Sequence, residues 1–312
     1  MARAGAAARR ERAADLIGLR RRGLRGLLRR ALWPLALLCL GGAGGYAYEV
    51  QLARPAMVFM GMPEVFRRGP EAWVRVLRNE AFMAGYSEWL GNSLWVSYQV
   101  HPRPSRPFNL PRPSRFRADP RTVRCLAVLA CIGHDDYSGS GYDRGHLAPN
   151  HVIASRYGER AQRETFLMSN ISPQRPEFNR QIWQRLEAIA EDDLAQRFGS
   201  FWVMTGPIFT EHPQHLPGIK RIAVPAAFYK ILIRPARPGE APRALAFVIP
   251  QTAAGTDDLR RFLVRIDDIE RWTGIDFFQA LPDGIEDAVE SRIEPAEWGF
   301  DAEVARRAPR YR

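Results

Sequence analysis

The sequence predicts an α+β protein with a central, mostly antiparallel sheet. Two observations support this fold class. First, some segments alternate like half-buried strands or are rich in aromatic and β-branched residues. These segments are residues 93–100, 201–209, 226–233 and 245–251. Second, loops that contain proline and glycine connect them in place of regular crossover helices, which favours antiparallel or mixed pairing. We expect helices to cover this sheet in one domain of about 230 residues.

The N-terminal tail, residues 1–31, is strongly basic. It holds ten arginines against Glu11 and Asp15, so it carries +8 of the formal net charge of +11. The rest of the chain carries only +3. The high charge therefore indicates targeting more than a nucleic-acid-binding surface.

An apolar run occupies residues 32–48. With about 17 residues it is at the short end for a membrane span, and the basic tail before it places the N-terminus in the cytoplasm. We expect a transmembrane anchor or a cleaved signal segment, followed by a juxtamembrane connector over 49–80 that is partly helical around 70–79. The remainder would then be tethered to the membrane on the periplasmic or extracytoplasmic side. The alternative is a mitochondrial presequence, with the protein in the intermembrane space.

After the connector we expect the main domain over 81–285 and a charged, weakly patterned tail over 286–312. One helix of the domain begins near Phe178, because the apolar residues that follow recur at helical spacing and would face the core. These residues are Ile182, Leu186, Ile189 and Ala190. A second helix is predicted over 257–272.

The three cysteines do not form a disulfide framework. Cys39 lies in the apolar run. Cys125 and Cys131 are six positions apart, which is too far for a disulfide along one strand unless a turn lies between them. We expect buried or free thiols and no zinc site.

The most informative segment is 139–150, where Asp143, Arg144 and His146 stand within four residues and glycines lie on both sides. Glycines permit tight turns, so this cluster is expected where a strand meets a loop. A histidine can accept a proton near neutral pH, and the planar guanidinium of arginine suits phosphate. Taken alone, the cluster is more typical of a structural ion pair beside a buried histidine.

The sequence downstream favours a catalytic interpretation. Residues 165–174 have the pattern of a short strand and a turn that lead into the helix near Phe178. Asn179, Trp183 and Glu187 fall at i, i+4 and i+8, so they share one helix face. An amide oxygen in the first turn can ligate a hard cation. A strand with histidine followed by a helix with Asn and Glu can hold one metal ion beside one base.

These motifs resemble the DNA/RNA non-specific endonucleases of the ββα-metal, or His-Me finger, superfamily, which include the endonuclease G-like enzymes. The resemblance rests on the signature 143–146, the block 169–174 and the helix 179–187, and it continues through 205–209 and 273–278. It implies an α+β fold with a ββα-metal finger active site. It also implies hydrolysis of DNA and RNA to 5′-phosphate products, and a possible homodimer.

The resemblance implies a role for each matching residue. His146 corresponds to the general base that activates water, and Asn179 to the one protein ligand of a divalent ion, Mg²⁺ or Mn²⁺. Glu187 corresponds to the acid that orients metal-bound water. Arg144 is the signature arginine, which contacts phosphate or supports the loop. A further arginine that stabilises the transition state corresponds to Arg115, although the register leaves Arg117 open.

One position departs from the family pattern. Glu191 stands where some members carry a phosphate-binding arginine, one helical turn after Glu187. The stretch 101–124 has seven arginines against the single acid Asp119. This stretch is expected to line the substrate groove, and the alternative is a solvated, proline-rich loop.

The chemical properties of these residue types support the same function without reference to the family. A histidine of ordinary pKa can act as a base at neutral pH, and Mg²⁺ needs few protein ligands. Such a site holds phosphate rather than bases, which predicts weak sequence preference. Two alternatives are a catalytically silent, membrane-tethered nucleic-acid-binding protein and a phosphodiesterase for small or lipid substrates. The first would lack the base or the metal ligand, and the second would need an enclosed apolar pocket.

Overall fold

The computed structural model describes residues 41–127, 131–236 and 240–308. Contacts divide the chain into two units, Met1–Ala53 and Arg54–Arg312. In the first unit the described residues are helical, with η1 over Glu49–Ala53. Among the described residues, no helix is both long and apolar enough to cross a membrane. The predicted tail 1–31 lies outside the described residues, as does half of the predicted anchor or signal segment 32–48.

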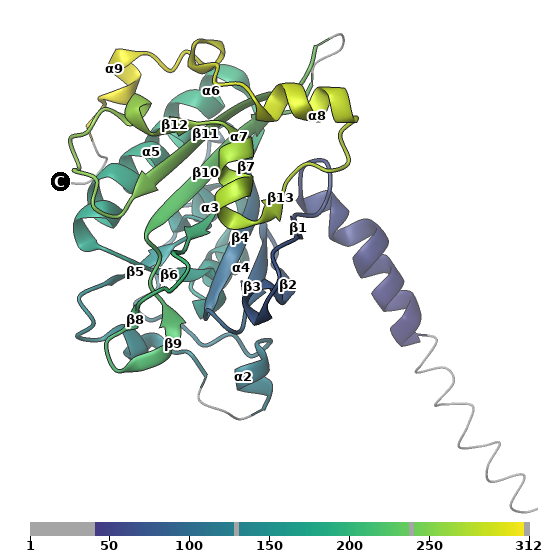
Figure 1. Cartoon of the computed structure of the whole chain (residues 1–312), viewed down its shortest axis with the longest axis vertical. Helices are drawn as coiled ribbons and strands as arrows, with labels where there is room; N and C mark the ends of the chain where they lie inside the picture. Colours follow the sequence, from purple (N-terminus) through teal and green to yellow (C-terminus); the bar gives the residue numbers. More distant parts are fainter. Residues whose placement is uncertain (1–40, 128–130, 237–239, 309–312) are drawn as a thin grey trace, which may run out of the picture. The chain divides into compact units, whose positions relative to one another are not determined.

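A seven-stranded antiparallel sheet forms the centre of the second unit (Figure 1). Its strand order is β12-β11-β10-β7-β4-β3-β2. The strands are β2 (Val74–Arg78), β3 (Phe82–Ser87), β4 (Asn92–Val100), β7 (Phe201–Ile208), β10 (Ala227–Arg234), β11 (Arg243–Pro250) and β12 (Leu263–Val264). The α+β class with a largely antiparallel sheet is confirmed, and β4, β7, β10 and β11 are the four strands that the sequence predicts.

Three two-stranded sheets and a set of helices surround this sheet. The small sheets pair β1 (Glu64–Val65) with β13 (Ile275–Asp276), β5 (Asp143–His146) with β6 (Ile171–Gln174), and β8 (His215–Leu216) with β9 (Ile219–Ala223). The α-helices are α2 (Val123–Leu126), α3 (Asn150–Tyr157), α4 (Glu159–Thr165), α5 (Gln184–Ala188), α6 (Ala195–Phe198), α7 (Ile266–Thr273), α8 (Asp283–Glu290) and α9 (Ala302–Ala305). The 3₁₀ and π segments are η2 (Pro55–Met57), η3 (Pro70–Ala72), η4 (His134–Tyr137), η5 (Met168–Asn170), η6 (Phe178–Trp183), η7 (Ile189–Leu194), η8 (Leu259–Phe262) and η9 (Pro295–Trp298).

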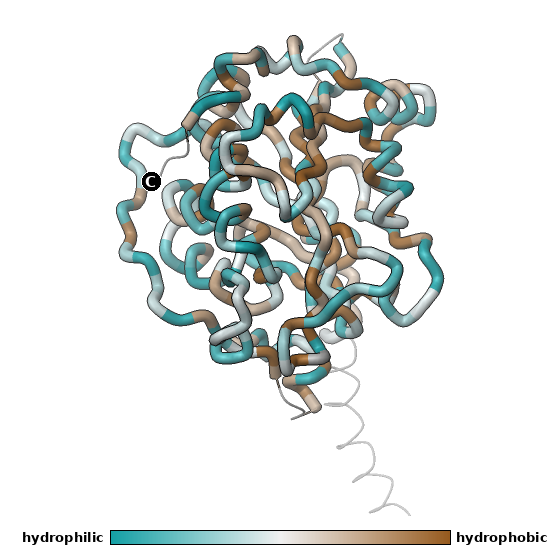
Figure 2. Tube along the Cα trace, turned by 60° about the vertical axis from the view of Figure 1, so that its left-hand side comes forward, coloured by the Kyte–Doolittle hydropathy of each residue, from teal (hydrophilic) through white to brown (hydrophobic). Residues whose placement is uncertain are grey.

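The two faces of the sheet bury different clusters of side chains. Alternate residues of β10 show this most clearly, since Phe228 and Leu232 belong to one cluster and Tyr229 and Ile231 to the other. Hydrophobic stretches of the chain, brown in Figure 2, run through the interior of this unit, and many of the outer loops are hydrophilic. Each large apolar side chain buried in this way contributes about 1.5–3 kcal/mol.

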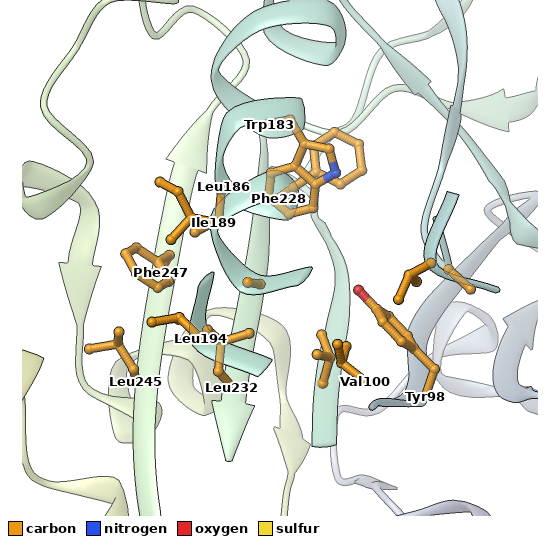
Figure 3. Close-up of a cluster of buried hydrophobic side chains, with 14 of the residues drawn as sticks. Tyr98, Val100, Trp183, Leu186, Ile189, Leu194, Phe228, Leu232, Leu245 and Phe247 are labelled. Carbon is orange, nitrogen blue, oxygen red and sulfur yellow. The ribbon is translucent and has the colours of Figure 1, made fainter. Parts of the chain in front are cut away.

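The long helical segment 178–198, formed by η6, α5, η7 and α6, covers one face of the sheet. Its apolar side chains point at strands β10 and β11, as the close-up of Trp183, Leu186 and Ile189 shows (Figure 3). The four residues predicted to face the core from this helix are all buried. Gly199 ends the segment at φ 79°, a conformation that glycine adopts without strain. The other face of the sheet packs against Ile266 and Ile269 of α7.

Two predicted helices are helical only in part, because α7 covers only the end of 257–272 and η3 only the start of 70–79. Residues 257–272 do not form one helix, because β12 interrupts them and pairs with β11, Phe247 opposite Leu263. Residues 70–79 form the single turn η3 followed by β2, which is an edge strand paired with β3. In both places pairing with the sheet overrides a local helical pattern.

The predicted free thiols are wrong. Cys125 and Cys131 form a disulfide with their Cα atoms 4.7 Å apart. The short helix α2, which contains Cys125, bends the chain so that the two cysteines come within reach of each other. The described part of the predicted C-terminal tail, residues 286–308, is also more ordered than its sequence suggests, because Trp298 and Phe300 are buried in the core.

Candidate active site

Strands β5 and β6 and the helical segment 178–198 together form a ββα unit. In the antiparallel pair, His146 lies opposite Ile171 and Gly145 opposite Ser172. A Cβ atom at Gly145 would collide with the side chain of Gln174, so the signature needs glycine at this position. The chain leaves β6 and enters the long helical segment at Phe178, which brings the signature strand and the helix to the same cavity.

This active-site cavity has a volume of about 820 Å³. It brings together four of the five predicted site residues. Its lining consists of Arg112, Phe116, Asp143, Arg144, His146, Pro149, Asn150, His151, Asn179, Arg180, Gln181, Gln184, Glu187 and Glu191. The fifth predicted residue, Arg115, is not part of the lining, and neither is its alternative Arg117.

His146 is held between two aromatic rings. The centre of its ring lies 5.4 Å from that of Phe116 and 5.1 Å from that of Phe166, and the Phe166 contact is edge to face. Its Nε2 atom is buried and has no hydrogen-bond partner among the described residues. Burial, with a smaller effect from the positive charge of Arg112, lowers the pKa of His146 to about 3. The imidazole is therefore neutral at physiological pH.

Asp143 orients the side chain of Asn179. The amide Nδ2 of Asn179 donates a hydrogen bond to Asp143 Oδ2 at 2.9 Å. Arg180 donates to both oxygens of the same carboxylate, at 2.8 and 2.7 Å. Because a carboxylate accepts from the NH₂ group and repels the carbonyl, this contact fixes which end of the amide is the oxygen. Asn179 Oδ1 is left available as a hard ligand, which fits a divalent ion such as Mg²⁺ that keeps most of its waters.

A buried lysine lies behind Glu187. Lys230 Nζ is 3.5 Å from Glu187 Oε1 and 3.3 Å from the hydroxyl of Tyr98, and it lies 4.5 Å from the centre of the Trp183 ring. Burial lowers the pKa of Lys230, while the charges of Glu187 and Glu191 raise it. Lys230 thus supplies a positive charge beside the carboxylates of the helix. This compensation explains how Glu191, only 2% exposed, is accommodated where the family pattern has arginine in some members.

The arginines divide into structural and cavity-facing groups. Arg144 donates from Nε and Nη2 to the carbonyl oxygen of His134, at 2.9 and 2.7 Å, which indicates that it supports the loop. Arg115 forms an exposed ion pair with Asp135 at 3.2 Å. Arg112 lines the cavity, and its guanidinium lies 5.2 Å from the centre of the Phe166 ring.

Sequence reasoning missed three lining residues: Arg112, Asp143 as the partner of Asn179, and Arg180. Arg112 stood inside the arginine-rich stretch, but nothing in the sequence separated it from its neighbours. Asp143 and Arg180 each lie beside a predicted site residue. The only feature of the sequence that could have indicated a contact between Asp143 and Arg180 is their opposite charge.

Known proteins are similar to this chain in both sequence and fold. A family model described as DNA/RNA non-specific endonuclease matches residues 62–284. The chain is 35% identical over 180 residues to the mitochondrial nuclease EXOG of Xenopus laevis, covering 54% of this chain and 48% of that protein. It is 31% identical over 228 residues to human mitochondrial endonuclease G, covering 69% of this chain and 73% of that protein.

A solved structure, described as the EndoG/EndoGI complex, agrees with this chain at a TM-score of 0.56 and 24% identity. The match covers 67% of this chain and 87% of that one, and at this identity it shows the fold alone. The chain matches about half the length of the EXOG relative and nearly three quarters of human endonuclease G. Together with the family model, these matches establish that the chain belongs to the DNA/RNA non-specific endonuclease family.

Proposed function

We propose that this protein is a metal-dependent, sugar-non-specific endonuclease that hydrolyses phosphodiester bonds of DNA and RNA. The observation that carries the proposal is the shared cavity, in which a neutral histidine and an oriented asparagine amide lie with Glu187 and Arg112. The relatives named as nucleases support the same reaction class. The cavity offers cationic and hydrogen-bonding side chains for phosphate, which predicts little sequence preference.

In the proposed mechanism, neutral His146 accepts a proton from the attacking water. The water oxygen forms a bond to phosphorus while the bond from phosphorus to the 3′ oxygen breaks, so the phosphate stays on the 5′ end. Arg112 offers positive charge to the phosphate in the transition state. The departing 3′ oxygen takes its proton from solvent.

Asn179 is the residue that would hold the divalent ion, Mg²⁺ or Mn²⁺, through its amide oxygen. When bound, such an ion neutralises charge on the phosphate and stabilises the leaving oxygen. Glu187, on the same helix, would accept hydrogen bonds from water molecules in the cavity and orient them. Asp143 keeps the amide of Asn179 in the orientation that a ligand requires.

The direct test is digestion of supercoiled plasmid and single-stranded RNA by the full chain, with Mg²⁺ or with EDTA. We expect Mg²⁺-dependent cleavage of both substrates and products with 5′-phosphate ends. His146→Ala should lose about 10²–10⁴-fold in rate, and Asn179→Ala should lose its metal-dependent activity. His215→Ala, which changes an exposed histidine outside the active-site cavity, is the matched control.

The silent-binding alternative makes the opposite prediction. It requires DNA retention in a gel shift with no cleavage under any divalent ion, and such a result would replace the proposal. The presence of His146, Asn179 and Glu187 in one cavity argues against it.

The location of the protein and its assembly are part of the proposal. An N-terminal segment that tethers the domain to the membrane, with the domain on the side away from the cytoplasm, would keep the nuclease away from the chromosome. The relatives named as mitochondrial proteins agree instead with the mitochondrial alternative. Fractionation of cells that express the tagged full chain distinguishes the two locations, and light scattering of the purified chain tests for a homodimer.

A further inference from the structure

A second group of acidic residues lies between α7 and α8. It consists of Asp267 and Glu270 of α7 and Glu290 at the end of α8. One carboxylate oxygen from each of the three residues lies within 4.8 Å of the other two. Helix α7 packs on the face of the sheet opposite the long helical segment 178–198, so this group is separate from the active-site cavity.

One carboxylate oxygen of Glu290 lacks the partner that a buried carboxylate oxygen normally has. Its side chain belongs to a residue only 6% exposed, and its Oε1 atom has no hydrogen-bond partner in the described part of the chain. Burial, together with smaller effects from the nearby carboxylates, of which Glu270 has the largest, raises the pKa of Glu290 to about 9. A buried carboxylate surrounded by like charges is costly unless a cation or a proton compensates it.

The neighbouring cations are engaged with a different acid. Arg265 and Arg271 both form ion pairs with Asp268, on α7 next to Asp267. Burial likewise raises the pKa of Glu270, to about 7, although its Oε1 atom accepts a hydrogen bond from the backbone of Phe277 at 2.7 Å. If all three converging carboxyl groups were ionised, they would carry an excess of negative charge, so without a cation the raised pKa values keep protons on them.

We propose that Asp267, Glu270 and Glu290 bind a calcium ion that joins α7 to α8. Calcium takes oxygen ligands at about 2.3–2.6 Å in flexible geometry, so one ion can reach oxygens up to roughly 5 Å apart. Magnesium demands about 2.0–2.1 Å and a stricter octahedron. The donor set holds neither sulfur nor imidazole, which favours a hard cation over zinc or copper.

Such an ion has a structural role that is independent of catalysis. It removes the repulsion among the three carboxylates, and it connects the end of α8 to the helix that covers the sheet. Val289, next to Glu290, belongs to the same core cluster as Ile266 and Ile269 of α7. Calcium binding is therefore expected to stabilise the packing of α8 on the core.

Thermal unfolding of the full chain, in EDTA and in Ca²⁺, tests this proposal. The Asn179→Ala variant serves as the parent, because it removes binding at the proposed catalytic ion site. We expect Ca²⁺ at 100 times its dissociation constant to raise the melting temperature by roughly 5–10 °C. Glu290→Gln should abolish this shift, and in EDTA it should melt close to the parent, because the raised pKa leaves the Glu290 carboxyl protonated when no ion is bound.

Asp287→Asn is the matched control, because it removes one carboxylate from an exposed position of the same helix. It should keep the full Ca²⁺ shift, and calorimetric titration with Ca²⁺ should give one site in the parent and none in Glu290→Gln. A Ca²⁺ shift that persists in Glu290→Gln would overturn the proposal. So would the absence of any Ca²⁺ shift in the parent, which would mean that the carboxylates share a proton instead. Because Asn179→Ala is the parent throughout, failure here is distinct from failure of the proposed nuclease activity.

Discussion

The environment of His146 predicts an unusual pH profile. A histidine of ordinary pKa, near 6.5, would be only about 3% neutral at pH 5. With its pKa lowered to about 3 by burial and by Arg112, His146 stays almost entirely neutral at that pH. Between pH 7 and pH 5, kcat/KM should therefore fall by much less than the roughly 25-fold loss expected of an ordinary histidine.

The assay is the initial rate of cleavage of a short fluorescent oligonucleotide at low substrate concentration and saturating Mg²⁺, from pH 4.5 to 8. This rate reports the ionisation of the free enzyme. Arg112→Gln should move the acid limb upward only partly, because burial is the larger cause of the lowered pKa. An acid limb in the wild type at or above pH 6.5 would refute the reasoning, since it would require a base of ordinary or raised pKa.

Three further predictions follow from the same region. Asp143→Asn should weaken apparent Mg²⁺ affinity about 10–100-fold, because the new side chain no longer fixes the orientation of the Asn179 amide. Unchanged affinity in a Mg²⁺ titration of activity would contradict this. Lys230→Met leaves the Glu187 carboxylate partly buried beside an apolar group, so the free energy of unfolding in urea should fall by about 3–5 kcal/mol. A urea midpoint equal to that of wild type would exclude a stabilising role for Lys230. Between pH 6.5 and about 3, His146 also binds fewer protons in the folded state than in the unfolded chain. The free energy of unfolding should therefore fall as the pH drops through that window, by up to about 1.4 kcal/mol per pH unit from this residue. His146→Ala should remove this contribution, and an unchanged pH slope of unfolding would contradict it.

The sequence was sufficient for the parts of the fold that depend on local pattern. The strands around residues 93–100 and 226–233 carry alternating or β-branched residues, and both belong to the central sheet. The helix after Phe178 was predictable because its apolar residues recur at helical spacing. The grouping of His146 with Asn179 followed from motif order, and both line one cavity.

Features that depend on distant partners could not be predicted in this way. The helix predicted over 257–272 forms only in part because β12 is defined by its pairing with β11, which no local pattern encodes. The disulfide between Cys125 and Cys131 depends on a turn that the sequence allowed but did not require. Arg112 lines the cavity while Arg115 pairs with Asp135, and both belong to one proline-rich loop. The sequence of such a loop has no periodic pattern, so the path of its backbone cannot be predicted from the sequence.

The central claim is that His146 and Asn179 act on one chemical step. The measurement that tests it most directly is the single-turnover rate of plasmid nicking in Mg²⁺ for wild type, the two single alanine variants and the double variant. We predict that each single variant loses about 10²–10⁴-fold, and that the double variant is little worse than either, because residues that act as a unit are not additive. A single variant within a few-fold of the wild-type rate would contradict the account.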